Sequence, residues 1–273
     1  MTNRKIFIIL FILIITSTVF FLIYGKKDTN EPELKKQALY SAQRGWQWLY
    51  NYKGNFLDPG IPRIIKTINN KYCGSKPEIE SFWKKILKEF EDHSYLSVFE
   101  RFFIDDSNYQ INDKVIEILQ TPQEDYNDVL AQALYCNLYP VRADFAEKTF
   151  DGIEKETRYD LTHKFWSAIL FKSNECAIKN YNIDNIISVA AQKIYEEQKK
   201  SNFDDLYAER TAFLMEYGFK NIVPEDWIKN IIANQNESGA WGTPTYFSKN
   251  FENPHTTALA IWSLVQYSQT CPF

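Results

Sequence analysis

The sequence predicts an all-α fold of stacked helical hairpins that follows one transmembrane helix. Apolar residues recur with helical spacing along most of the chain, and no stretch shows sustained alternation of apolar and polar residues. One long apolar segment lies near the N-terminus. With 273 residues, 45% of them hydrophobic, the chain is long enough to bury a substantial core, which excludes a wholly disordered protein.

The apolar segment covers residues 6–24 and contains only three small polar side chains. At about 1.5 Å per residue it rises roughly 28 Å, close to the thickness of the bilayer hydrocarbon core. We expect an uncleaved signal anchor over residues 6–25. A cleaved signal peptide is the alternative, although the segment does not end in the small residues of a typical cleavage site.

The expected domain organisation follows from this anchor. Two basic residues stand on each side of the apolar segment, so the charge asymmetry is slight, and we favour residues 1–5 in the cytoplasm. Residues 26–38 are polar and read as a linker, and residues 39–273 form the folded domain. This domain is acidic and is expected outside the cytoplasm, as a single-pass membrane protein, or secreted if the anchor is cleaved.

Helices of two kinds alternate in the domain. One kind carries its apolar residues on a single face, as in residues 79–90, 183–194 and 227–232. The other kind is apolar nearly all round and must be covered on several sides, as in residues 129–138, 161–171 and 256–267. This alternation predicts helical hairpins with an outer and an inner layer.

The junction before the last helix carries a specific motif. Gln235, Gly239 and Trp241 lie in the sequence QNESGAWG, and weaker copies surround Gln120 and Gln198, which predicts a hairpin repeat of about 39 residues. The motif resembles the Q-x(2-5)-G-x-W repeat of triterpene cyclases. With the HTTALAIWSL helix that follows, the chain is similar to the α/α toroid superfamily of terpenoid cyclases and protein prenyltransferases. The resemblance implies a ring of five or six hairpins.

The catalytic motifs of that superfamily are absent. Asp105-Asp106 and Asp204-Asp205 lack the leading Asp of the D-x-D-D element of triterpene cyclases. His255 lies at a helix start comparable to that of the prenyltransferase zinc ligand, but no convincing Asp and Cys partners accompany it. The resemblance therefore implies a fold, while cofactor and metal remain unknown.

Four cysteines bear on the compartment and on the tertiary structure. They lack C-x-x-C spacing, which disfavours a thiolate zinc cluster, and outside the cytoplasm they allow one or two disulfides in three pairings. A Cys73–Cys271 bridge would fasten the C-terminal residues. Cys136 lies in an apolar helix, where the simpler interpretation is an unpaired cysteine buried as a small hydrophobic residue. The fourth cysteine is Cys176.

Candidate site residues lie at the starts of the inner helices. In a toroid these starts share one mouth, where a pocket is expected. The candidate acid–base or metal-binding residues there are Asp160, His163, Asp204, Asp205 and His255. Asp125, Asp128, Glu209 and, less securely, His93 also lie near helix starts. The simpler interpretation is that the Asp residues are N-caps and the His residues are hydrogen-bonded rim or core residues.

Three functions remain open. The first is a membrane-tethered binding or interaction module whose ligand is a glycan, a hydrophobic small molecule or a protein. The second is a glycan hydrolase or lyase with Asp128, Asp204 and Asp205 as acid and base and with Trp46 and Trp241 stacking on sugars. The third is a degenerate isoprenoid enzyme. A net charge of −4 without a long basic tract argues against nucleic acid as a partner.

Overall fold

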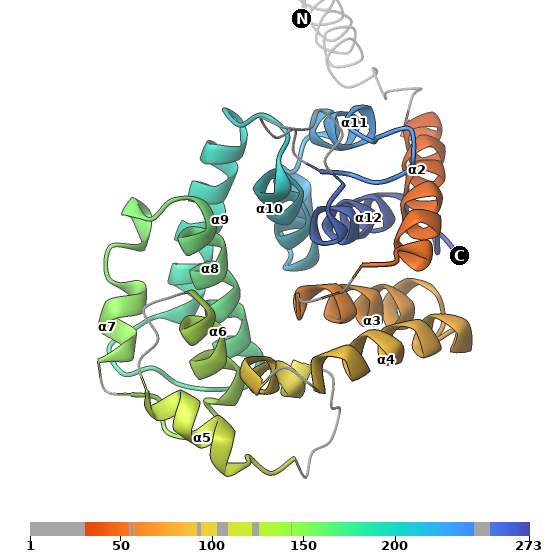
Figure 1. Cartoon of the computed structure of the whole chain (residues 1–273). Helices are drawn as coiled ribbons and strands as arrows, with labels where there is room; N and C mark the ends of the chain where they lie inside the picture. Colours follow the sequence, from red (N-terminus) through yellow and green to blue (C-terminus); the bar gives the residue numbers. More distant parts are fainter. Residues whose placement is uncertain are drawn as a thin grey trace, which may run out of the picture. The chain divides into compact units, whose positions relative to one another are not determined.

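A computed structural model describes residues 31–54, 56, 58–91, 94–102, 109–121, 126–142, 144–242 and 252–273 (Figure 1). These residues form eleven α-helices and three short 3-10 helices and contain no strand, which confirms the predicted all-α fold. Within these ranges no helix is long and apolar enough to cross a membrane. The predicted signal anchor over residues 6–25 lies outside the described residues.

The chain divides into two units between Gln37 and Ala38. Of the first unit, the structure describes the opening turns of helix α2, which begins at Glu31, inside the segment expected to be a linker. The second unit contains the remaining elements. In chain order the helices are α2 (Glu31–Asn51), α3 (Gly60–Tyr72), α4 (Pro77–Glu91), η1 (Ser94–Phe102), α5 (Asp113–Gln120), α6 (Tyr126–Tyr135), α7 (Phe145–Phe150), η2 (Ile153–Lys155), α8 (Arg158–Ser173), α9 (Ile183–Gln198), α10 (Asp205–Glu216), η3 (Lys220–Ile222), α11 (Glu225–Ala233) and α12 (Pro254–Ser268).

Within the second unit the packing contacts form a closed circuit. Helix α12 packs on α3 and on α10, α10 packs on α8, and α8 packs on α6. The circuit returns from α6 through η1 and α4 to α3, and Figure 1 shows α10 beside α12. Helices α5, α9 and α11 each contact the member of the circuit that follows them in the chain.

The two predicted kinds of helix differ in burial as expected. In α12, twelve of fifteen residues are buried, so this helix is covered on nearly every side. In α11, only Trp227, Ile228 and Ile231 are buried, and they lie on one face. Pro224 precedes the first turn of α11, and Glu225 stands within it, where acidic side chains interact favourably with the helix dipole.

The QNESGAWG junction joins the last hairpin to α2. Gln235 Nε2 donates to the carbonyl oxygens of Ser41, at 2.8 Å, and of Gly239, at 2.7 Å. Gly239 has φ of +100°, and a Cβ there would lie 2.6 Å from the Arg44 carbonyl oxygen, so both conformation and space require glycine. Trp241 is fully buried, and its indole N–H donates to the Ile231 carbonyl at 2.7 Å.

A second glycine allows α2 to approach this junction. A Cβ on Gly45 would lie 2.5 Å from the Trp241 ring and 3.0 Å from the Ile261 side chain. Arg44, the residue before Gly45, also contacts the junction. Its guanidinium donates to the carbonyl oxygens of Asn236 and Glu237. The motif therefore works as a tertiary clamp between elements almost 200 residues apart.

Two disulfides complete the unit. Cys73 pairs with Cys271, which confirms the bridge considered from the sequence, and Cys136 pairs with Cys176. The interpretation of Cys136 as an unpaired buried hydrophobe is therefore wrong. Helix α6 ends at Tyr135 instead of continuing to residue 138, so Cys136 lies in the following turn and reaches the segment after α8.

Candidate functional site

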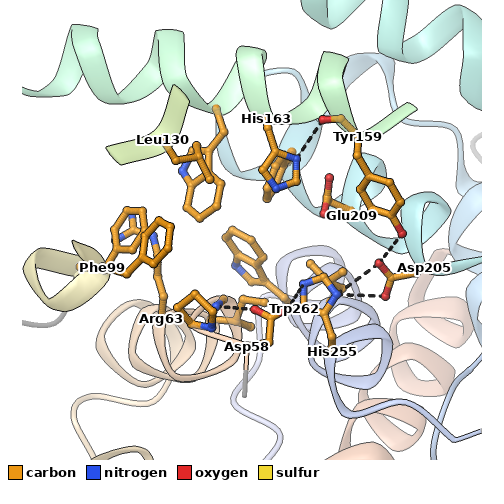
Figure 2. Close-up of a pocket in the computed structure, with 17 residues that line it drawn as sticks. Asp58, Arg63, Phe99, Leu130, Tyr159, His163, Asp205, Glu209, His255 and Trp262 are labelled. Carbon is orange, nitrogen blue, oxygen red and sulfur yellow. Dashed lines mark hydrogen bonds and ion pairs between the residues drawn. The ribbon is translucent and has the colours of Figure 1, made fainter. Parts of the chain in front are cut away.

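A cavity of about 440 Å³ lies inside the circuit of helices (Figure 2). Side chains from α3, η1, α6, α8, α10 and α12, together with the segment before α3, line it. This volume is in the usual range for small-molecule sites. Several polar lining residues lie just before α3 or within the first two turns of α8, α10 and α12. These residues are Asp58, Tyr159, His163, Asp205, Glu209 and His255.

His255 is held between two carboxylates. Its Nδ1 lies 3.1 Å and 3.2 Å from the two carboxylate oxygens of Asp205, and its Nε2 lies 3.7 Å from Oδ2 of Asp58. Burial opposes a charge on the ring, but attraction to Asp58 and Asp205 outweighs it and raises the pKa of His255 to about 10. At neutral pH the imidazole is therefore a cation that donates to Asp205.

Asp205 is fully engaged by its neighbours. Thr256 donates its hydroxyl to Oδ1 at 2.6 Å, and Tyr159 donates its hydroxyl to Oδ2 at 2.9 Å. Burial opposes ionisation, but His255 and these hydrogen bonds lower the pKa of Asp205 to about 2. Since both oxygens are occupied, Asp205 is suited to orient His255 and Tyr159 rather than to exchange a proton.

Glu209 is the carboxyl group suited to proton transfer. It lies one turn after Asp205 on α10, is 2% exposed, and its Oε1 has no hydrogen-bond partner among the described residues. Burial raises the pKa of Glu209 to about 7, although His255 and a hydrogen bond with Thr162 act in the opposite direction. A carboxyl group with this pKa can donate and accept a proton near neutral pH.

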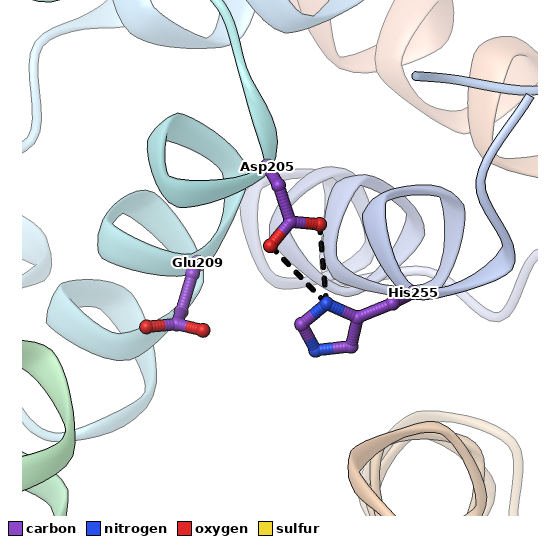
Figure 3. Close-up of side chains that lie close together, drawn as sticks. All are labelled: Asp205, Glu209 and His255. Carbon is purple, nitrogen blue, oxygen red and sulfur yellow. Dashed lines mark hydrogen bonds and ion pairs between the residues drawn. The ribbon is translucent and has the colours of Figure 1, made fainter. Parts of the chain in front are cut away.

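Figure 3 shows Asp205, Glu209 and His255, whose nearest ligand atoms lie within 4.8 Å of one another. These are metal-ligand types, and the spacing would accommodate a cation. However, Nδ1 of His255 is directed at Asp205, and both Asp205 oxygens accept hydrogen bonds from Tyr159 or Thr256. A metal would have to replace these contacts, so the arrangement fits a hydrogen-bonded acid–base network better than a metal centre.

His163 lines the cavity beside this network. Its Nδ1 donates to the carbonyl oxygen of Tyr159 at 2.9 Å, one turn earlier on α8. Burial lowers the pKa of His163 to about 4, so the ring is neutral at physiological pH. The two cavity histidines therefore carry different charges, because at His255 the attraction of Asp58 and Asp205 outweighs burial, whereas at His163 burial outweighs the attraction of Asp58 and Asp160.

The other end of the cavity is aromatic. Phe102 and Trp166 stack with ring centroids 5.1 Å apart, Trp166 lies 5.3 Å from Phe213, and Phe213 lies 6.1 Å from Trp262. In Figure 2, Phe99 lies at the end away from Tyr159 and Asp205, with Trp262 between them. A ligand in this cavity would contact ring faces at one end and ionisable groups at the other.

The structure brings together three of the five predicted site residues. His163, Asp205 and His255 line the cavity. Asp160 is exposed on α8, and Asp204 is the N-cap of α10, where it accepts a hydrogen bond from the Tyr207 amide; neither contributes to the lining.

Other residues considered from the sequence lie elsewhere. Asp128 forms a two-point ion pair with Arg142 away from the cavity lining, with distances of 3.0 Å and 2.6 Å. Trp46 and Trp241 do not line the cavity either. His93, Asp125 and the Asp105-Asp106 pair lie outside the described residues.

Sequence reasoning missed three functional candidates, Asp58, Arg63 and Tyr159, and it placed Glu209 near a helix start without including it among the candidate acid–base residues. Asp58 precedes Pro59 and Gly60, a helix-start pattern that resembles the other inner starts and could have been recognised. Glu209 follows Asp205 by four residues, which places both on one helix face. Arg63 and Tyr159 carry no such signal, because their position depends on how the helices pack.

Comparisons of the chain with protein-family models, with curated proteins and with solved structures find no match.

Proposed function

We propose that the second unit is an α/α toroid whose central cavity is the active site of a glycan hydrolase, with Glu209 as the general acid. The closed circuit of packing contacts and the cavity inside it support the toroid. The observation that supports the activity most directly is the buried Glu209 carboxyl, whose pKa is raised to about 7. It lies beside Asp205 and His255 in a cavity with an aromatic end.

Glycoside hydrolysis needs two carboxyl groups with different protonation states. Glu209 donates its proton to the glycosidic oxygen as the bond from that oxygen to the sugar carbon breaks. Asp58, whose side chain is 42% exposed, accepts a proton from the water that attacks the same carbon. The added hydroxyl and the transferred proton complete the hydrolysis, and solvent restores both carboxyl groups.

The remaining polar groups support this chemistry. His255 stands between Asp58 and Asp205 as a cation and limits repulsion between the carboxylates. The aromatic rings at the other end offer faces on which a sugar ring can pack. An isoprenoid ligand is less well matched, because burying seven polar or ionisable side chains against a hydrocarbon is unfavourable.

The proposal includes a membrane tether outside the cytoplasm. The apolar segment at residues 6–25 supports the anchor, and the two disulfides are typical of oxidising compartments. Protease treatment of intact cells tests this: the domain should be digested while a cytoplasmic control protein survives. Protection of the domain in intact cells and digestion only after lysis would contradict it.

The activity is tested with the full chain in detergent micelles. Chitotetraose, cellotetraose and tetragalacturonate are incubated with the protein, and new reducing ends are measured. We expect cleavage of at least one, and a loss of about 100-fold or more in kcat/KM in Glu209→Gln. Glu196→Gln, an exposed substitution on α9, is the matched control and should retain activity.

Circular dichroism establishes that each variant is folded. Equal cleavage by the wild type and Glu209→Gln would overturn the assignment of the acid. Saccharide binding without cleavage by the wild type would overturn the catalytic proposal and favour the binding module.

A further inference from the structure

Arg63 occupies the aromatic end of the cavity. It lies in the first turns of α3 and lines the cavity. Its guanidinium carbon lies 4.5 Å from the centroid of the Phe102 ring and 5.7 Å from that of the Trp166 ring. Cation–π contacts of this kind hold a guanidinium in place without using its N–H donors.

Most of the donors of Arg63 remain available to a ligand. A guanidinium has five N–H donors, and one contact is made with the Tyr217 hydroxyl. Among the residues that the structure describes, Arg63 forms no ion pair with a carboxylate. The fixed plane, the remaining donors and the position in the cavity lining are the features of an anion-binding group.

The charges of the cavity are separated along its length. Figure 2 places Arg63 and Phe99 at one end and Asp205, His255 and Glu209 at the other. The carboxyl groups of Asp58 and Asp205 face the cation of His255 from two sides, so the acidic end has no excess positive charge. An anionic group of a ligand is therefore favoured near Arg63 and disfavoured near Glu209.

We infer that Arg63 binds a carboxylate of the ligand, so that the substrate of this cavity is an acidic glycan. The assignment of the ligand as a glycan rests on the proposed glycan hydrolysis. The assignment of its carboxylate rests on Arg63 alone. A planar carboxylate accepts two parallel hydrogen bonds from one guanidinium. A single arginine matches one negative charge, whereas a phosphate dianion would need a second cation, and His255 already faces Asp58 and Asp205.

The geometry orients the substrate. With the carboxylate on Arg63, the sugar ring that carries it packs between the aromatic side chains, and the neighbouring glycosidic bond extends toward Glu209. Trp262 lies between the two ends and is positioned to contact the bound ring (Figure 2). Recognition of the acidic group and cleavage of the bond are thus carried out by different residues at opposite ends of one cavity.

The test compares two trisaccharides that differ in charge. Isothermal titration with the full-length Glu209→Gln protein in detergent, which prevents turnover, measures the affinity for an α-1,4-galactotriose with one terminal galacturonate ring and for the uncharged α-1,4-galactotriose. We expect the mono-uronate trisaccharide to bind roughly 10- to 100-fold more tightly, as charge-assisted hydrogen bonds contribute on this scale. Adding Arg63→Gln should remove this preference and leave the affinity for galactotriose similar.

Two further variants make the result specific. Arg63→Lys keeps the charge but loses the planar fork, so it should retain only part of the preference. Arg158→Gln, an exposed arginine at the start of α8, is the matched control and should retain all of it. A galactotriose with one 6-O-sulfate on its terminal ring distinguishes the anion: tighter binding of the sulfated sugar than of the mono-uronate trisaccharide would overturn the carboxylate assignment.

The outcomes separate the two proposals. Equal affinity of the Arg63-containing protein for charged and uncharged trisaccharides would overturn the inference, whether or not the Arg63 variants fold, while cleavage of a neutral glycan would still support hydrolysis. A carboxylate preference that depends on Arg63, in a wild-type protein that cleaves no saccharide, would support the inference and overturn the hydrolase.

Discussion

Substitution of Glu209 by Gln is expected to make the protein more stable at alkaline pH. The ordinary pKa of a Glu side chain is 4.5, and burial raises that of Glu209 to about 7 in the folded protein. The folded state therefore binds the proton more tightly than the unfolded state does. The associated stability is fully present below pH 4.5 and is lost as the pH rises through 7.

The size of this loss follows from the difference between the two pKa values, which corresponds to about 3 kcal/mol. Gln resembles the protonated carboxyl in shape and cannot ionise. The stability of the variant relative to the wild type should therefore increase by about 3 kcal/mol between pH 4.5 and pH 8. For a domain of this size this is a difference of roughly 6–12 °C in Tm.

Thermal unfolding of the two full-length proteins, followed by circular dichroism at a series of pH values, measures the difference directly. Subtraction of the two profiles removes the titration of groups that both proteins share. Glu196→Gln, on the exposed side of α9, should give a profile parallel to that of the wild type. Parallel profiles for Glu209→Gln as well would show that Glu209 ionises as an ordinary carboxyl, and the acid–base assignment would fail.

Three further predictions concern the scaffold. Gly45→Ala should lower the free energy of unfolding by about 1–3 kcal/mol in chemical denaturation, because its Cβ would lie 2.5 Å from the Trp241 ring; an unchanged midpoint would contradict this contact. Replacing Cys136 and Cys176 together by Ser should cost about 4 kcal/mol by the chain-entropy relation for a 40-residue separation, and wild-type and variant proteins with equal Tm under non-reducing conditions would argue against the bridge. Gln198→Met should cost about 1–2 kcal/mol by calorimetry, because the buried amide donates to a backbone carbonyl at 3.0 Å that Met cannot reach; no loss would show that this copy of the motif is not structural.

Much of the fold was predictable because its signal is local. The apolar residues of α12 cover nearly every side, and those of α11 cover one face, so the inner and outer positions of these helices follow from periodicity. Gln235 and Trp241 are likewise recognisable by spacing, and their hydrogen bonds in the structure are those of a clamp at a helix junction.

The composition of the site was only partly predictable. His163, Asp205 and His255 were found because they lie at helix starts, where the chain direction brings polar residues to one mouth. The same rule selected Asp160 and Asp204, since it does not fix the direction in which a side chain points around the helix.

Arg63 shows what periodicity cannot supply. On α3 it lies among buried isoleucines, and the ring faces on which it rests come from Phe102 on η1 and Trp166 on α8, which are distant in the sequence. The protonation states are equally non-local, because the charge of His255 depends on Asp58 and Asp205 from two other elements, whereas burial keeps His163 neutral despite the attraction of Asp58 and Asp160.

The clamp between α2 and the final hairpin can form only after the end of the chain has been synthesised. Ser41 and Arg44 emerge from the ribosome long before Gln235 and Asn236, and the Cys73–Cys271 bridge spans 198 positions. Such high contact order slows folding, because the opening helices must wait for the closing ones. Until α12 is translated, the apolar surfaces of α3 and α10 that it covers stay exposed, and such exposed surface favours aggregation of an incomplete domain.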